Sequence, residues 1–213
     1  MRNPKLRPSI RLALTVLIVT LAAASPLAAA QDKLSRHAFA ADMRKLWEDH
    51  ITWTRLFIVD ATAGLPSKDA TTARLLQNQT DLGNAIKPFY GDAAGTKLTA
   101  LLRDHILIAA DLVGAAAAGD TAKKNAANQR WFANADEIAA FLTGANPKNW
   151  PADASKKMMH DHLNLTTNEV VAHLGKDWKA DVAAYDAVHA QILHMADMLS
   201  AGIEKQFPDK FKE

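Results

Sequence analysis

Residues 46–53 read LWEDHITW, and two later stretches of the chain follow the same pattern. Residues 101–108 read LLRDHILI, and residues 158–165 read MMHDHLNL. Each stretch has two apolar residues, a variable residue, Asp, His, an apolar residue, a variable residue and a final apolar residue. The histidines are 55 and 57 residues apart (105 − 50 and 162 − 105). This nearly even spacing predicts three similar structural units, each with one histidine.

Apolar residues recur every three or four positions along most of the chain, which is the pattern of amphipathic helices. Glycine and proline interrupt this pattern, for example at Gly64, Gly91 and Pro147. No run alternates between apolar and polar residues, so no sheet is expected. The helices that we expect cover residues 36–63, 69–87, 92–118, 122–143, 153–174 and 176–206. These six helices pair as three consecutive hairpins and predict an all-α, pseudo-threefold bundle.

A second set of residues repeats with nearly the same period on the second helix of each hairpin. Asn78, Asn134 and His189 are 56 and 55 residues apart (134 − 78 and 189 − 134). Arg74 and Arg130 both lie four residues before their asparagine. Two independent registers therefore agree on one period, which favours three hairpins that close around a common axis.

The first thirty residues have the layout of a secretory signal peptide. Four basic residues precede the apolar run 12–24, which carries no charge, and small residues precede Gln31. The apolar run is short for a bilayer span, which needs about 20 residues. We therefore expect a Sec-type signal in residues 1–30, a single domain in residues 31–213, and a periplasmic or secreted bacterial protein without a stable membrane span.

Composition excludes several classes of function. Removing residues 1–30 leaves 25 − 4 = 21 Lys and Arg against 23 Asp and Glu, a formal charge of −2. A mildly acidic chain without basic tracts is poorly suited to bind nucleic acid. The chain has no cysteine, which excludes a thiol nucleophile, a zinc–thiolate site and covalent haem attachment through thioethers.

The repeated histidines are the strongest candidates for a binding site. If the hairpins are equivalent, His50, His105 and His162 occupy equivalent positions, and His189 approaches from a second helix. Neutral imidazoles are common metal ligands, and three or four of them suit zinc or copper. The sequence therefore predicts a transition metal or a small polar ligand held by histidines in the bundle interior.

Other repeated polar residues are candidates to support this site. Asp49, Asp104 and Asp161 each precede a histidine and are turned from it by about 100° on a helix. Each could accept a hydrogen bond from a histidine of the next hairpin, or could pair with an arginine instead. The remaining polar candidates are Asn78, Asn134, Arg74 and Arg130.

Two other interpretations use the same residues. In a structural or partner-binding bundle, the histidines are internal hydrogen-bonding groups without catalytic activity. In a metal hydrolase or oxidase, the site has an open coordination position with an acid or base nearby. The sequence alone does not decide between these interpretations and the binding protein.

The stretch LWEDHITWTR, residues 46–55, resembles the opening of an uncharacterised bacterial family of small helical proteins. The resemblance continues through TTARLL, PFYG and RWFANADEI, at residues 71–76, 88–91 and 130–138, and covers most of the chain after residue 30. Members often carry the names of glycosyltransferases or acetylglutamate kinases. Both activities need a phosphate-binding site, usually on an α/β scaffold, and these residues contain no such motif.

Overall fold

The computed structural model describes residues 33–212, and the predicted signal peptide lies outside them. The described part is all-α, as predicted, with five helices. Their bounds are α1 Arg36–Ala63, α2 Lys68–Ala117, α3 Thr121–Ala145, α4 Ala152–Leu174 and α5 Trp178–Gln206. Side chains cap three of the helix starts by accepting a backbone N–H, namely Ser35, Asp120 and Asp177.

The ends of the described chain pair with each other, a feature that the sequence did not predict. Strand β1 (Leu34–Ser35) pairs in parallel with β2 (Phe211–Lys212), which follows the short 3-10 helix η1 (Pro208–Lys210). A two-residue strand is too short to produce an alternating apolar pattern, which explains the difference from the predicted absence of strands.

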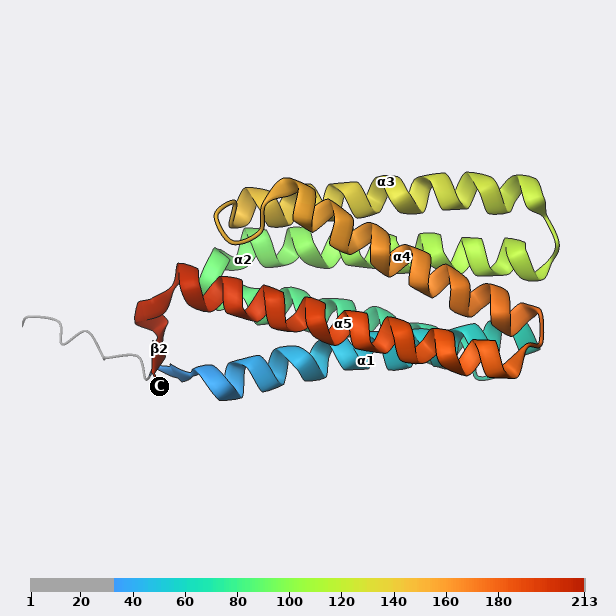
Figure 1. The fold of residues 1–213 in the computed structure, drawn as a ribbon, viewed down its shortest axis with the longest axis horizontal. Helices are drawn as coiled ribbons and strands as arrows, with labels where there is room; N and C mark the ends of the chain where they lie inside the picture. The colour runs from blue at the N-terminus through green and yellow to red at the C-terminus, as the bar shows by residue number, and fades with distance from the viewer. Residues whose placement is uncertain (1–32, 213) are drawn as a thin grey trace, which may run out of the picture. The chain divides into compact units, whose positions relative to one another are not determined.

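Helix α2 covers two of the six predicted helices and reverses direction at Gly91. Gly91 has φ 84° and ψ 169°, a conformation that favours glycine. On either side of it, the Nη1 atom of Arg103 lies 3.5 Å from the carbonyl oxygen of Leu76, and Gly83 packs against Gly95. The two halves of α2 therefore run side by side in opposite directions. Figure 1 shows this reversal at the end where α4 begins.

Gly83 allows the two halves of α2 to approach closely. A Cβ atom at Gly83 would lie 2.6 Å from the carbonyl oxygen of Gly95 and 1.9 Å from the hydroxyl of Thr99. We expect Gly83→Ala to lower the free energy of unfolding by about 1–3 kcal/mol, because the backbones must separate. Gly114→Ala, on the same helix with no atom within 4 Å of the added Cβ, should raise it by about 0.5–1 kcal/mol. Urea titration would measure both changes, and equal effects would contradict the explanation.

Consecutive helices pack on each other, and α5 returns to pack on α1 (Figure 1). This contact between α1 and α5 is lined by ion pairs along its length. Their distances are 3.5 Å for Arg36–Glu204, 2.6 Å for Arg44–Asp197, 3.1 Å for His189–Glu48 and 2.5 Å for Arg55–Asp181. Together with the pairing of β1 and β2, they close the bundle.

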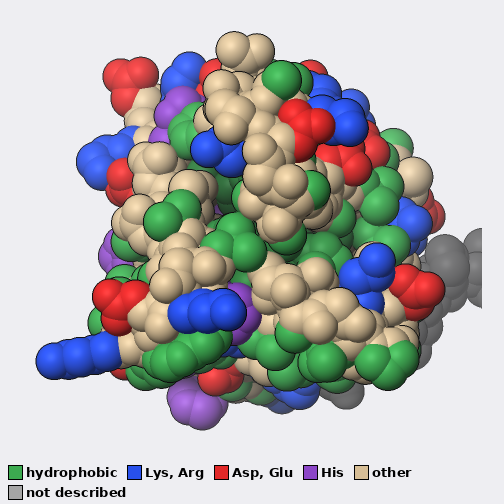
Figure 2. Space-filling model, turned by 90° about the vertical axis from the view of Figure 1, so that its right-hand side faces the viewer, with side chains coloured by type: hydrophobic (Ala, Val, Ile, Leu, Met, Phe, Trp, Pro, Cys, Tyr) green, Lys and Arg blue, Asp and Glu red, His purple; other side chains and the backbone are tan. Residues whose placement is uncertain are grey.

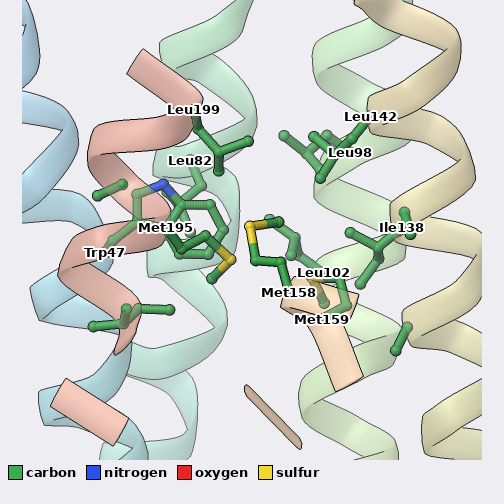
Figure 3. Packing of buried hydrophobic residues seen from close by; sticks show 14 of the residues in the cluster. Trp47, Leu82, Leu98, Leu102, Ile138, Leu142, Met158, Met159, Met195 and Leu199 are labelled. Atoms are coloured by element: carbon green, nitrogen blue, oxygen red, sulfur yellow. The ribbon is translucent and has the colours of Figure 1, made fainter. Parts of the chain in front are cut away.

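The main core fills the half of the bundle on the side of the Gly91 reversal. Met158 and Met159 of α4 lie between Trp47 and Met195 on one side and Ile138 on the other (Figure 3). In the other half, a smaller core cluster includes Phe57, Ile58, Leu75, Ile106, Val113 and Val170. A cavity accompanies this second cluster, and the repeated histidines lie between the two halves.

Candidate functional site

The structure brings His50, His105 and His162 together from α1, α2 and α4. Their exposed fractions are 3%, 2% and 3%. The ring centroids of His50 and His162 are 5.8 Å apart, and those of His105 and His162 are 6.3 Å apart. Because the three repeats carry the histidine at the same place on the inner helix face, the rings meet in one layer across the bundle.

A side-chain amide positions His105. The carbonyl oxygen of Asn134 lies 2.9 Å from Nδ1 of His105, and its NH2 group donates to the backbone carbonyl of Leu101 at 3.1 Å. Leu101 is one helical turn before His105. The amide thus links the imidazole to the helix that carries it.

The same arrangement recurs at His162, with Gln191 as the amide. The carbonyl oxygen of Gln191 lies 3.1 Å from Nδ1 of His162, and its NH2 group donates to Met158, one turn before the histidine, at 3.2 Å. Gln191 therefore holds the place that the sequence alignment gave to His189. The alignment missed it because the third hairpin is shifted by two residues relative to the second.

His50 departs in part from this arrangement. Asn78 donates to the carbonyl of Leu46, one turn before His50, at 2.9 Å. Its own carbonyl oxygen, however, accepts a hydrogen bond from Gln79 at 3.0 Å. Nδ1 of His50 is buried and has no hydrogen-bond partner of ordinary geometry within residues 33–212. The amide–carbonyl bond is thus common to all three hairpins, whereas the bond to the imidazole is present at His105 and His162.

The hydrogen bonds at His105 define its tautomer. Because the NH2 group of Asn134 is directed to a carbonyl, its oxygen faces the ring, and Nδ1 of His105 must donate. Nε2 then carries the lone pair, and it accepts a hydrogen bond from the indole N–H of Trp131 at 3.1 Å. The sequence analysis had assigned Trp131 only to the core.

Burial keeps all three imidazoles neutral. It lowers the pKa of His105 to about 3 and that of His162 to about 4. Burial also lowers the pKa of His50 well below its usual value, and the neighbouring His162 and His105 lower it further. A protonated imidazole here would have no carboxylate partner among the cavity-lining residues.

The three histidines form the floor of a cavity of about 290 Å³. The walls are mainly apolar and come from α1, α2, α3 and α4, with no residue from α5. The outer part includes Lys124 and Asn125, which are exposed, and Val171, which is 64% exposed. The cavity therefore opens near the start of α3 and the end of α4. Figure 2 views this end of the bundle, where hydrophobic side chains lie between charged ones.

Two threonines that line the cavity use their hydroxyl groups within their own helix. The hydroxyl of Thr54 donates to the carbonyl of His50 at 2.8 Å, and that of Thr166 donates to the carbonyl of His162 at 2.9 Å. Ala109 holds the corresponding position after His105. The imidazoles consequently supply most of the hydrogen-bonding capacity of the inner cavity.

Several predicted site residues lie outside this cluster. His189 is on the α1–α5 contact, where Nε2 lies 3.1 Å from a carboxylate oxygen of Glu48. Asp49 and Asp161 pair with lysines one turn earlier in their own helices, both at 2.6 Å, and Asp104 is exposed. The aspartates face outward because they are one residue, about 100°, away from the buried histidines.

The two predicted arginines form ion pairs on the surface. Arg74 lies 3.7 Å from Asp49, so the alternative pairing proposed for that aspartate occurs. Arg130 pairs with Asp111 at 2.9 Å and not with Asp104. Neither arginine lines the cavity.

The fit of the histidine layer to zinc or copper is poor. Nε2 of His105 is already bonded to Trp131, and Nδ1 of His105 and His162 face amides. No carboxylate lines the cavity to balance a divalent charge. Within residues 33–212, no three or more His, Cys, Asp or Glu side chains are arranged to hold a metal ion.

Comparison of the chain with protein-family models, with curated proteins and with solved structures finds no match. The family resemblance of residues 46–55 therefore stays a prediction. Among the described helices, none combines the length and the apolar character needed to cross a bilayer.

Proposed function

We propose that this protein is an exported binding protein for a small, mainly apolar organic molecule. The observation that carries the proposal is the cavity of about 290 Å³ with three buried, neutral histidines at its closed end. This volume is at the lower limit of typical small-molecule sites, about 300–1,000 Å³. Such sites commonly combine apolar walls with a few polar groups that orient the ligand.

The walls and the floor of the cavity have different roles in this proposal. The walls include Ile58, Leu75, Leu112 and Val170, and contact with them removes apolar ligand surface from water. Each Å² of such surface contributes about 25 cal/mol. The imidazoles of the floor form hydrogen bonds that set the orientation of the ligand.

We also propose that the bundle consists of three copies of one helical hairpin. In each copy, a side-chain amide of the second helix donates to the carbonyl four residues before the histidine of the first helix. These bonds support the repeat because they involve equivalent atoms at intervals of 55 to 57 residues. The repeat implies the same tautomer at His105 and His162, a point that the imidazole nitrogen shifts described in the next subsection test.

The binding proposal is tested with N-phenyl-1-naphthylamine, whose fluorescence rises in apolar surroundings. We expect one molecule to bind per chain. Ala109→Leu should weaken binding at least about tenfold, because Ala109 lines the cavity and the added atoms fill it. The thermal midpoint of unfolding should not fall, since apolar atoms enter an apolar space. The same preparation tests export, because the mass of the exported chain should correspond to a start at Gln31.

Ala183→Leu is the matched control, because Ala183 is exposed on α5, which contributes no residue to the cavity. Equal binding by both variants, or no binding by the original protein, would contradict the proposal and favour a structural bundle. Zinc and copper ions are tested separately. One equivalent of tightly bound metal that is lost in both His105→Phe and His162→Phe would instead favour a metal-binding protein.

A further inference from the structure

We infer that the cavity selects neutral molecules that carry a hydroxyl or N–H group on an apolar body, and that this group donates a hydrogen bond to Nε2 of His162. This inference rests on the proposed binding function and specifies the class of ligand. It follows from the direction of the hydrogen bonds around His162, from the lack of a partner for one ring atom, and from the charges that line the cavity.

The first step is the direction of the hydrogen bonds at His162. The NH2 group of Gln191 donates to the carbonyl of Met158, so the oxygen of Gln191 faces Nδ1 of the histidine. An amide oxygen only accepts, and Nδ1 must therefore carry the proton. In a neutral imidazole the other nitrogen, Nε2, then has a free lone pair. Gln191 is thus a positioning residue that fixes His162 as a hydrogen-bond acceptor toward the cavity.

The second step is the availability of this acceptor. Nε2 of His105 accepts from Trp131, and the hydroxyl groups of Thr54 and Thr166 are bonded to backbone carbonyls. Nε2 of His162, in contrast, has no hydrogen-bond partner within residues 33–212, although His162 lines the cavity and is only 3% exposed. A buried acceptor without a partner is costly, so a donor from a ligand would satisfy it.

The third step is the charge of the ligand. The floor carries no charge because its histidines are neutral, and no acidic residue lines the cavity. A cationic ligand would lose its hydration without meeting a carboxylate, and an anionic ligand would meet no cation at the floor. The one basic residue in the lining, Lys124, is exposed at the opening. A neutral hydroxyl or N–H group fits these conditions.

The experiment compares 2-naphthol with 2-methoxynaphthalene, which has the same ring system but no donor. Both are titrated at pH 7.5 with calorimetric or fluorescence detection. We expect 2-naphthol to bind about tenfold to a hundredfold more tightly, because the ether leaves the acceptor of His162 without a partner. Equal affinities would overturn the inference but leave the binding function intact. Absence of binding by both compounds would contradict the binding function as well.

Two variants locate the acceptor. His162→Phe should lower the affinity for 2-naphthol to that for 2-methoxynaphthalene, whose own affinity should stay within about threefold. Thr167→Val is the matched control, since the hydroxyl of Thr167 lines the cavity but already donates to the carbonyl of Leu163 at 2.8 Å. This control should keep the preference for 2-naphthol. Loss of the preference in Thr167→Val but not in His162→Phe would overturn the assignment.

A measurement on the unmodified protein does not depend on the folding of any variant. Nitrogen-15 chemical shifts of the imidazole rings distinguish a protonated from an unprotonated nitrogen. We expect Nε2 of His162 to be unprotonated at pH 7.5, and its shift should change when 2-naphthol binds. A proton on Nε2 in the free protein would overturn the inference, because the ring would then present a donor to the cavity.

Discussion

Acidification from pH 7.5 to 5.0 is expected to lower the free energy of unfolding by about 4 kcal/mol through His105 and His162 alone. Burial holds their pKa values at about 3 and about 4, below the value of about 6.5 expected in the unfolded chain. The unfolded state therefore binds protons first as the pH falls. The stability is fully present above pH 6.5 and decreases toward pH 4. His50, whose pKa is also lowered, adds to the loss.

Urea titrations at the two pH values would measure this effect, and His162→Gln isolates one contribution to it. In this variant, acidification should cost about 2 kcal/mol less than in the original protein. Other groups cancel in the difference, including Glu169, whose pKa is raised by burial and which acts with the opposite sign. Asp181, whose pKa Arg55 lowers, loses its contribution only at lower pH. An identical acid response in both proteins would disprove the role of His162.

Replacing Arg55 by Met is expected to lower the free energy of unfolding by about 3–5 kcal/mol. Arg55 donates two hydrogen bonds to Asp181, at 2.5 and 2.6 Å, and a third to Glu169 at 3.1 Å. Asp181 and Glu169 are 2% and 1% exposed, so the substitution leaves two buried carboxylates beside each other. His173 also lies 3.0 Å from Asp181 but cannot replace a guanidinium that contacts both acids.

Arg130→Met is the control for this effect. Arg130 also pairs with an aspartate, Asp111 at 2.9 Å, but both side chains are more than half exposed. Its loss should change the free energy of unfolding by at most about 1 kcal/mol. Adding Glu169→Gln to Arg55→Met should recover part of the loss, because one buried charge is removed. Urea unfolding would measure all three proteins, and equal effects of the two arginine substitutions would show that burial does not govern the interaction.

Much of the fold was predictable from the spacing of apolar residues. The all-α class and most helix positions follow from it, and the structure confirms the class. The predicted break at Gly91 corresponds to a change of direction inside α2 and not to a separate loop. A single residue with positive φ is enough to reverse the chain here, because glycines on both halves allow their backbones to approach.

The candidate site was predictable only where local sequence determines it. The intervals between the three repeated histidines indicated a common position, and their rings do lie in one layer. The outward orientation of Asp49 and Asp161 also had a local signal, since Lys45 and Lys157 precede them by four residues and pair with them. That signal argued against a place in the interior, and the sequence analysis did not use it.

Other features depend on contacts between distant segments. Gln191 lies among the inward-facing residues of α5, but the apolar pattern does not show which carbonyl its amide reaches. Arg55 and Asp181 are 126 residues apart, and no local pattern pairs them. The cavity arises because the side chains of four helices together do not fill the space above the histidines. Such a difference in packed volume cannot be obtained from one helix at a time.

The ion-paired contact between α1 and α5 has a consequence for the order of folding. Each helical hairpin joins segments that are close in the chain, whereas this contact must enclose all the helices between them. The entropy of closing a loop increases with its length, so local hairpins can form before this contact is established. We therefore expect the two ends of the bundle to meet last on the folding pathway. Opposite charges along both helices would then guide the encounter, so dissolved salt would slow this final step.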